Sequence, residues 1–343
     1  MRNLFIIHTQ YNLLLAVGLC MSDFEKDCND LILFREFNIK NSQKRCIKKV
    51  FDRVKILEGN SFAKSFGTGK KLVKIRCDNR KIKEFIDFEY ERIFIVDDMC
   101  IQEMYALKCV YRKNRGVRMS WLEDGTSAYF SSFDVSKGMG ATPLRRLIRK
   151  IFFSIVFGMW KYYDLGSCIG THKLLKQAYL VYPELARPEL TDKELVGISD
   201  RAFILGVKAL FDGDQYQFEE NGVIIVVDKL DIYGDNLDKV NGLIAEEVGR
   251  AHDRCQKIYY KYHPRETEKL PAVEFETELD RNIAIEGYLA NSNTKNLTVL
   301  GVQSTSLQTA KKMGYKVISL IQRVEPDNVV VIDFYKKINI ECV

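Results

Sequence analysis

Leu4-Phe5-Ile6-Ile7 is a run of four apolar residues between polar neighbours, and the fold can be deduced from the recurrence of such runs along the chain. Similar runs follow at regular intervals, with helix-forming stretches between them. In the first half of the chain they are Leu31–Phe34, Val54–Leu57, Ile93–Val96 and Val117–Trp121. Short apolar runs of this kind are typical of strands buried on both faces of a parallel sheet.

A second series of apolar runs begins after Pro183. It comprises Val223–Val227, Ile258–Tyr262, Leu297–Leu300, Val317–Ile321 and Val329–Ile332. Between them, Asn236–Arg254 and Ser304–Lys312 combine helical spacing with good helix formers. The two series predict an α/β protein of two Rossmann-like, doubly wound lobes that face each other across a cleft.

The chain length agrees with two lobes of ordinary size. We expect an N-terminal lobe over residues 1–185, a connection over 186–220 and a C-terminal lobe over 221–343, because Pro183 and Pro188 interrupt the pattern. Of the 343 residues, 46% are hydrophobic and 29% are charged, which excludes a disordered or low-complexity protein. We find no internal sequence repeat.

The chain is mildly basic, with 52 Lys and Arg against 46 Asp and Glu and a net charge of +6. This balance suits anionic substrates or a membrane surface, and it argues against nucleic acid as a partner. Nine cysteines are scattered without a CxxC pair or a Cys/His cluster. They indicate reduced thiols and a cytoplasmic protein without a structural zinc site. The first apolar run is too short for a signal peptide.

One segment departs from the alternation of strands and helices. The basic stretch Pro143–Lys150 runs directly into the apolar, aromatic-rich stretch Ile151–Trp160, which is about half of the ~20 residues needed to span a bilayer. The pattern suits a helix near 144–160 that lies on the inner face of an anionic membrane. A core helix with a solvated basic start is equally compatible, and so is a homodimer surface.

Trp121-Leu122-Glu123-Asp124-Gly125 contains the strongest local motif. Two adjacent carboxylates and a turn-forming glycine follow an apolar strand, and ligands of open α/β sheets bind at the carboxyl ends of strands. Either Glu123 or Asp124 would there act as a general base on a substrate hydroxyl. The alternative is an ordinary turn, since Asp-Gly is a common turn dipeptide.

A second strand ends in His263-Pro264. The proline restricts the histidine to extended backbone, and a histidine at this place can neutralise or protonate a leaving phosphate. An ordinary surface histidine is the alternative. His8 competes with His263, because it also follows a predicted strand, in His8-Thr9-Gln10.

Further along, Gly301 leads into Ser304-Thr305-Ser306, which opens a predicted helix. Hydroxyls and free N–H groups at a helix N-terminus can bind an anion, although they also serve as a simple cap. Upstream, Glu286 can accept hydrogen bonds from a ribose diol or be merely solvated. GxGxxG, P-loop and GxSxG motifs are absent from the sequence. Because Asp97 and Asp98 are adjacent and diverge in extended chain, we expect no metal site.

The order of these motifs carries a family resemblance. Glu123-Asp124-Gly125, then His263-Pro264, then Ser304-Thr305-Ser306 resembles the bacterial sialyltransferases of the GT-B type, with their D/E-D-G, H-P and Ser/Thr signatures. The chain looks most like glycosyltransferase family 52, with the capsular polysialyltransferases as close relatives. The opening segment Ile6–Asn12 also resembles that group's first strand and acceptor-side loop.

The resemblance implies a role for each matching residue. Asp124, or else Glu123, would be the general base, and His263 would stabilise the CMP phosphate, with Pro264 shaping the turn. The residues that would bind the donor are Ser304, Thr305, Ser306 and Glu286. The acid that holds the cytidine ribose often has a proline two residues before it, and here Ala284 occupies that position. On the acceptor side lie His8, Thr9 and Gln10.

The implied activity is that of an inverting, metal-independent sialyltransferase. Its donor would be CMP-sialic acid, and its acceptor a hydroxyl of a lipid-linked bacterial surface glycan, such as lipooligosaccharide or capsule. Three other interpretations stay open: a GT-B transferase that uses CMP-Kdo or a UDP-sugar, a UDP-sugar epimerase, and a non-enzymatic basic protein that binds membrane or polyanion.

Overall fold

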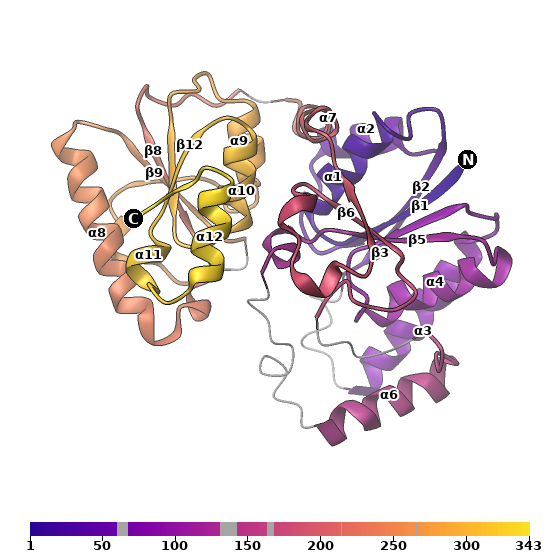
Figure 1. Cartoon of the computed structure of the whole chain (residues 1–343). Coiled ribbons are helices and arrows are strands. Elements are labelled where there is room, and N and C mark those ends of the chain that lie inside the picture. Colours follow the sequence, from indigo (N-terminus) through magenta and orange to yellow (C-terminus); the bar gives the residue numbers. More distant parts are fainter. Residues whose placement is uncertain (60–67, 131–142, 163–167, 214, 265) are drawn as a thin grey trace. The chain divides into compact units, whose positions relative to one another are not determined.

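The computed structural model describes residues 1–59, 68–130, 143–162, 168–213, 215–264 and 266–343. These residues form two compact units, Met1–Leu210 and Phe211–Val343. Each unit contains one parallel sheet with helices on both of its faces (Figure 1). The expected architecture of two doubly wound α/β lobes is thereby confirmed at the level of the separate lobes.

Within its described residues, the first unit has a seven-stranded sheet of order β3-β2-β1-β4-β5-β6-β7. Its strands are β1 (Arg2–Ile7), β2 (Cys28–Arg35), β3 (Arg53–Glu58), β4 (Arg92–Ile95), β5 (Arg118–Leu122), β6 (Gln177–Leu180) and β7 (Glu194–Gly197). Its helices are α1 (Gln10–Cys20), α2 (Asn41–Val50), α3 (Thr68–Phe85), α4 (Ile101–Lys113), α6 (Pro143–Phe157) and α7 (Asp200–Leu210). Helices α1, α2 and α7 cover one face, and α3 and α4 cover the other (Figure 1).

The described part of the second unit has a six-stranded sheet of order β10-β9-β8-β11-β12-β13. Its strands are β8 (Val223–Val227), β9 (Ile258–Tyr262), β10 (Thr277–Glu278), β11 (Thr298–Gly301), β12 (Lys316–Ser319) and β13 (Glu341–Cys342). Its helices are α8 (Leu237–Asp253), α9 (Ile285–Ala290), α10 (Thr305–Lys312), α11 (Ile321–Val324) and α12 (Val329–Lys337).

The same strand order governs both sheets. In each sheet the first strand of the unit lies in the interior, the next two strands are added on one side of it, and the remaining strands are added on the other side. The switch point, where the order of the strands reverses, therefore lies between β1 and β4 in the first sheet and between β8 and β11 in the second. Ligands of open parallel sheets bind at the carboxyl ends of the strands at this switch point. The residues that follow β1, β4 and β5, and those that follow β8, β9 and β11, are therefore the ones placed for binding.

The apolar run that opens the chain forms the centre of the first unit. Leu4, Phe5, Ile6 and Ile7 are fully buried in β1. The ring of Phe5 stacks on Phe94 of the neighbouring strand β4, with ring centroids 4.4 Å apart. Burying one such side chain contributes about 1.5–3 kcal/mol, so this central pair anchors the sheet.

The segment 186–220, expected as a connection, is largely part of the first unit. It contributes strand β7 at the sheet edge and helix α7, which packs against α1 through two glycines. A Cβ atom at Gly206 would lie 2.2 Å from the carbonyl oxygen of Leu14, and one at Gly18 would lie 2.1 Å from that of Ala202. The two helix backbones thus approach closely because neither glycine has a side chain.

The prediction of a strand at Val329–Ile332 is wrong, because these residues form the start of helix α12. Val331, Ile332 and Tyr335 are buried, which is the i, i+1, i+4 spacing of a helix face, whereas Val329 and Val330 are exposed. A run of four apolar residues fits both a buried strand and a helix turn, so its length alone was misleading. The other predicted runs form strands of the sheets.

The basic and apolar segment near 144–160 forms helix α6 and the turn after it. Among the described residues, no helix combines the length and the apolar character needed to cross a bilayer. The side chains of Arg145, Arg146 and Arg149 lie outside the described part of the structure.

The glycine contact between α1 and α7 gives a stability test. We expect Gly206→Ala to lower the free energy of unfolding by about 1–3 kcal/mol, since the added methyl group collides with backbone that cannot move aside. Gly249→Ala in α8, where a Cβ atom has no neighbour within 4 Å, is the matched control and should be neutral or stabilising by up to about 1 kcal/mol. Urea unfolding measures both, and equal stabilities would contradict the close contact.

Candidate active site

Asn12, in the first turn of α1, ties this helix to the turn that follows β5. Thr9 caps α1, since its hydroxyl accepts a hydrogen bond from the backbone N–H of Asn12 at 3.1 Å. The buried side-chain amide of Asn12 donates to the carbonyl oxygen of Glu123 at 2.9 Å and to Oδ1 of Asp124 at 3.2 Å. Gln10 is the first residue of α1 and is half-buried. The cap thus positions an amide that fixes the Glu-Asp turn.

Glu123 is completely buried and acts as an anchor. Its carboxylate accepts hydrogen bonds from the hydroxyls of Tyr11 and Tyr129. It also accepts one from the backbone N–H of Val181, at 2.7 Å. A buried carboxylate requires such donors, because its desolvation would otherwise cost several kcal/mol. Glu123 therefore joins α1, the turn after β5 and the end of β6.

Asp124 has a different environment from that of its neighbour. It is half-buried, and Gly125 follows it with a φ of 66°, a left-handed conformation that permits the sharp turn into the 3₁₀ helix Gly125–Ala128. The side chain of Asp124 is held by the Asn12 amide, and its carbonyl oxygen accepts from the Ser127 hydroxyl. Of the two acids, Asp124 is the one within reach of a ligand at this sheet edge.

His8 follows β1 and lies beside Glu103 of α4. Its Nε2 is 2.7 Å from Oε1 of Glu103, and its ring stacks on Phe34 with centroids 4.4 Å apart. Although burial opposes the charged form, the Glu103 carboxylate raises the pKa of His8 well above its ordinary value. The half-buried His8 and the buried Glu103 therefore form an ion pair at the switch point of the first sheet.

The residues around His8 include the one group of potential metal ligands found among the described residues: His8, Cys100 and Glu103, whose ligand atoms lie within 4.8 Å of one another. Glu103 also accepts hydrogen bonds from the backbone N–H groups of Val96 and Asp97. Burial and the charge of Glu103 raise the pKa of Asp97 to about 7. The carboxylate of Glu103 is thus already engaged in joining the ends of β1 and β4.

Asp97 and Asp98 diverge, as the sequence predicts for neighbours in extended chain. The buried carboxylate of Asp98 accepts from the backbone N–H groups of Gly170 at 2.9 Å and His172 at 2.8 Å. The carboxylate of Asp97 accepts instead from the N–H of Met99, at 2.9 Å. The two acids stabilise separate loops.

In the second unit, three neighbouring strands of the sheet end in polar residues. Asp228 follows β8, His263 follows β9, and Gly301 at the end of β11 leads to Ser304. The backbone N–H of His263 donates to the carbonyl oxygen of Val227 at 2.9 Å, so the extended pairing continues one residue past β9. His263 and Pro264 are both exposed, and Arg265 lies outside the described residues.

Ser304 caps helix α10. Its hydroxyl accepts from the N–H of Ser306 at 3.3 Å, and its own N–H donates to the hydroxyl of the buried Tyr335 at 3.0 Å. Ser304, Thr305 and Ser306 are all half-buried. Helix N-termini carry partial positive charge, so hydroxyls and N–H groups gathered here form a suitable anion site.

Asp228 was not identified from the sequence, although it lies beside Ser304 at the switch point. Its buried carboxylate accepts from the Tyr233 hydroxyl at 3.1 Å and from the backbone N–H of Gln303 at 3.4 Å. Burial raises the pKa of Asp228 to about 7, against the opposing effect of a hydrogen bond with Ser304. An acid after the most central strand of the series could have been singled out by its position alone.

Glu286 lies in the first turn of α9 and is buried. Its Oε1 accepts from the hydroxyl of Thr309 in α10 at 2.9 Å, and burial raises the pKa of Glu286. Burial also lowers the pKa of the nearby Lys261 to about 8, although the Glu286 carboxylate opposes this shift. Glu286 is thus held against α10 rather than solvated.

The sequence-predicted residues therefore form two groups, one in each unit. In the first unit the structure brings Thr9 close to the Glu123-Asp124 turn through Asn12, while His8 is paired with Glu103. In the second unit, Ser304 to Ser306 and Glu286 lie on the adjoining helices α10 and α9. Sequence reasoning quoted Tyr11 and Asn12 within the segment Ile6–Asn12 but gave them no role of their own, and it did not single out Asp228. Asn12 and Asp228 are buried and Tyr11 is half-buried.

Comparison with known proteins gives one family. The family model described as alpha-2,8-polysialyltransferase (POLYST) matches residues 3–322, and therefore spans both units. No curated protein sequence matches the chain.

Solved structures similar to the chain share its fold at low sequence identity. The alpha/beta-galactoside alpha-2,3-sialyltransferase of Photobacterium phosphoreum is 9% identical, with 99% of this chain and 98% of that chain covered and a TM-score of 0.50. The UDP-GlcNAc 2-epimerase of Neisseria meningitidis bound to UDP-GlcNAc is 10% identical over 98% and 91%, with a TM-score of 0.52. The S. aureus MnaA–UDP structure is 12% identical over 96% and 82%, with a TM-score of 0.50. The likeness identifies the fold as GT-B.

The different surroundings of the two acids lead to a stability prediction. We expect Glu123→Gln to lower the free energy of unfolding by about 1–3 kcal/mol, because an amide cannot accept from all three donors that converge on this buried carboxylate. Asp124→Asn, the matched control at the half-buried neighbour, should change stability by less than about 1 kcal/mol. Urea unfolding of the two variants tests this, and the reverse order of stabilities would overturn the anchor role of Glu123.

Asp228 leads to a pH prediction. A carboxyl group whose pKa is raised on folding retains its proton in the folded state, so its contribution to stability falls as pH rises from about 4 to about 7 and then levels off. We therefore expect wild-type protein to lose more unfolding free energy between pH 5 and pH 8 than Asp228→Asn does. Chemical denaturation at several pH values measures this, and parallel curves would show that Asp228 does not titrate in this range.

Proposed function

The chain belongs to the alpha-2,8-polysialyltransferase family and is a sialyltransferase, and from this premise we propose that it uses CMP-sialic acid as its donor. The acceptor in this proposal is a hydroxyl of a surface glycan such as capsule or lipooligosaccharide. Transfer proceeds in one step, with inversion at the anomeric carbon and without a metal ion.

The observation that carries the proposal is the difference in burial and hydrogen bonding between Glu123 and Asp124. Glu123 is buried under three hydrogen-bond donors, while Asp124 is half-buried at the carboxyl end of β5 and oriented by Asn12. An oriented carboxylate that a ligand can reach is what proton abstraction from an acceptor hydroxyl requires. We therefore assign Asp124 as the general base and Glu123 as the residue that holds the turn.

The second unit supports a role in donor binding. The phosphate of CMP would accept hydrogen bonds at the N-terminus of α10 from Ser304, Thr305 and Ser306, where the helix favours negative charge. His263 would donate a proton or a hydrogen bond to the departing phosphate. Glu286, held by Thr309, would accept from the ribose hydroxyls.

The bond changes balance in a single displacement. The acceptor oxygen forms a bond to the anomeric carbon, the bond from that carbon to the phosphate oxygen breaks, and its electron pair leaves with CMP. The acceptor proton moves to Asp124. Since His263 and the N-terminus of α10 would stabilise the negative charge that develops on the phosphate, a divalent ion is not required for that task.

Transfer from CMP-sialic acid to an oligosialic acid acceptor, with EDTA present, tests the proposal. We expect Asp124→Asn to reduce kcat by about 10²–10⁴-fold while CMP affinity, measured by calorimetry, stays within threefold of wild type. His263→Ala should weaken CMP binding and reduce kcat by about 10²-fold or more. The anomeric configuration of the product, followed by NMR, reports inversion.

Matched controls distinguish site effects from charge effects. Asp333→Asn changes an exposed carboxylate on α12, and His252→Ala changes an exposed histidine on α8, and both should leave kcat unchanged. Preference for UDP over CMP would retain the GT-B fold and refute the donor. Full activity of Asp124→Asn would refute the assigned base.

A further inference from the structure

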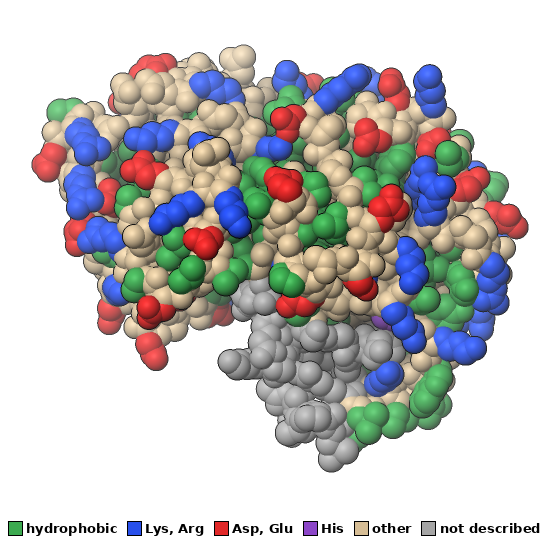
Figure 2. Space-filling model, viewed as in Figure 1, with side chains coloured by type: hydrophobic (Ala, Val, Ile, Leu, Met, Phe, Trp, Pro, Cys, Tyr) green, Lys and Arg blue, Asp and Glu red, His purple; other side chains and the backbone are tan. Residues whose placement is uncertain are grey.

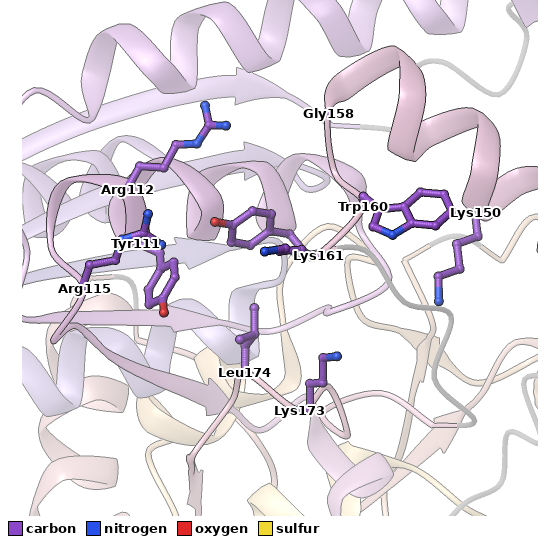
Figure 3. Close-up of a pocket in the computed structure, with 10 residues that line it drawn as sticks. Tyr111, Arg112, Arg115, Lys150, Gly158, Trp160, Lys161, Lys173 and Leu174 are labelled. Atoms are coloured by element: carbon purple, nitrogen blue, oxygen red, sulfur yellow. The ribbon is translucent and has the colours of Figure 1, made fainter.

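A basic pocket lies at one edge of the first unit, on residues that the proposed reaction does not use. Its volume is about 850 Å³, and it lies between the C-terminal end of α4, helix α6 with the turn that follows, and the loop before β6 (Figure 3). Five cationic side chains line it: Arg112, Arg115, Lys150, Lys161 and Lys173. None of the described residues that line the pocket is acidic.

Aromatic rings and a helix end give this pocket a defined shape. The guanidinium of Arg115 lies over the ring of Tyr111, 4.6 Å from its centroid, and Tyr111 in turn packs edge-on against Tyr162. Helix α6 ends at Gly158, whose φ of 61° requires a left-handed conformation. The ammonium group of Lys108 holds this end by donating to the carbonyl oxygen of Phe157 at 2.9 Å.

Helix α6 beside the pocket presents an apolar face to solvent. Leu147, Ile148, Ile151, Phe152 and Ile155 are exposed. Their spacing of one and four residues places them on one side of the helix. Ile148 is 57% exposed and Ile155 is 73% exposed, while Ser154 and Phe157 on the opposite side are buried. Figure 2 shows this apolar surface as a green ridge at the lower right, with blue side chains next to it.

Trp160, in the turn after α6, is a further exposed apolar side chain. It is 65% exposed and also lines the pocket, close to Lys150 in the view of Figure 3. A tryptophan between an apolar face and a cluster of cations is typical of the boundary between lipid chains and headgroups.

We propose that helix α6 and this pocket form a binding site for an anionic phospholipid bilayer. The apolar face of α6 enters the boundary between headgroups and acyl chains, and the pocket accepts the phosphate groups of the lipids beneath it. Helix α6 has 15 residues, which is too short to span a bilayer and suits a helix that lies in the interface. The inference is independent of the proposed donor and reaction.

The combination of basic and apolar side chains favours an anionic bilayer over a soluble polyanion or a second copy of the chain. A soluble polyanion would satisfy the five cations, but it would leave the apolar face of α6 in water. A second copy of the chain, related by a twofold axis, would place the same patch on both sides of the interface and bring two basic pockets together. An anionic bilayer satisfies both the cations and the apolar side chains.

Vesicle binding by the full chain tests the proposal. We expect cosedimentation with vesicles of phosphatidylcholine and phosphatidylglycerol in a 7:3 ratio, weak binding to phosphatidylcholine alone, and loss of binding at high salt. Of the two tryptophans of the chain, Trp121 is buried and Trp160 is exposed. A blue shift of fluorescence on addition of anionic vesicles, absent from Trp160→Phe, should therefore report insertion at the α6 turn.

Two double variants separate the charged and apolar parts of the site. Lys161→Glu with Lys173→Glu should reduce the partition coefficient at least tenfold, because each basic residue near an anionic surface strengthens binding. Ile148→Gln with Ile155→Gln should reduce it by a similar factor. Matched controls are Lys48→Glu with Lys49→Glu on α2 and Val329→Gln with Val330→Gln on α12, all at exposed positions. The melting temperature and transfer to a soluble acceptor verify that every variant folds.

Three results would overturn the proposal. One is equal binding to neutral and anionic vesicles. Another is binding to soluble polyphosphate that needs Lys161 and Lys173 but not Ile148 and Ile155, without binding to vesicles, which would identify a polyanion site. The third is a dimer by light scattering that Ile148→Gln with Ile155→Gln dissociates, again without vesicle binding.

Discussion

A carboxylate without access to water must be surrounded by donors, and in the first unit this requirement is met at Glu123. The donors that it needs come from α1, from the 3₁₀ turn after β5 and from the end of β6. These segments are far apart in the sequence, so satisfying one buried charge fixes the geometry of an entire sheet edge. Asp124 follows immediately, and its orientation depends on this anchor and on Asn12. The proposed base is therefore positioned both by the anchored turn and by its own contact with Asn12.

The strand order explains why polar residues gather where they do. In both sheets the chain reverses direction beside the first strand, which leaves the carboxyl ends of neighbouring strands without a crossing connection. In the first unit this place holds the His8–Glu103 pair, and in the second it holds Asp228 beside Ser304. Both places hold titratable side chains that join neighbouring segments through an ion pair or hydrogen bonds. The same topological feature therefore brings titratable groups together in both units.

The sequence could predict what depends on local pattern. Strand-length apolar runs, the helix Leu237–Asp253 and the cap at Ser304 all follow from periodicity and capping rules. The helix at Val329 was mistaken for a strand, because four apolar residues have no distinctive period. The short strands β7 and β13 exist only through pairing with a neighbour, which no local pattern reveals. Likewise, the distinct surroundings of Glu123 and Asp124 depend on contacts with Tyr11 and Val181, over a hundred and over fifty residues away.

Helix α6 shows how two opposed interpretations of a sequence can each describe one side of the same helix. The sequence left open whether this segment is a core helix or a surface helix for a membrane. In the structure Ser154 and Phe157 are buried, as a core helix requires, while Ile148 and Ile155 are exposed. A core helix alone does not explain an outward apolar face, since exposing such a face in water offers no stability. The anionic bilayer proposed above would cover this face, and the five cations of the adjoining pocket would bind its negatively charged headgroups.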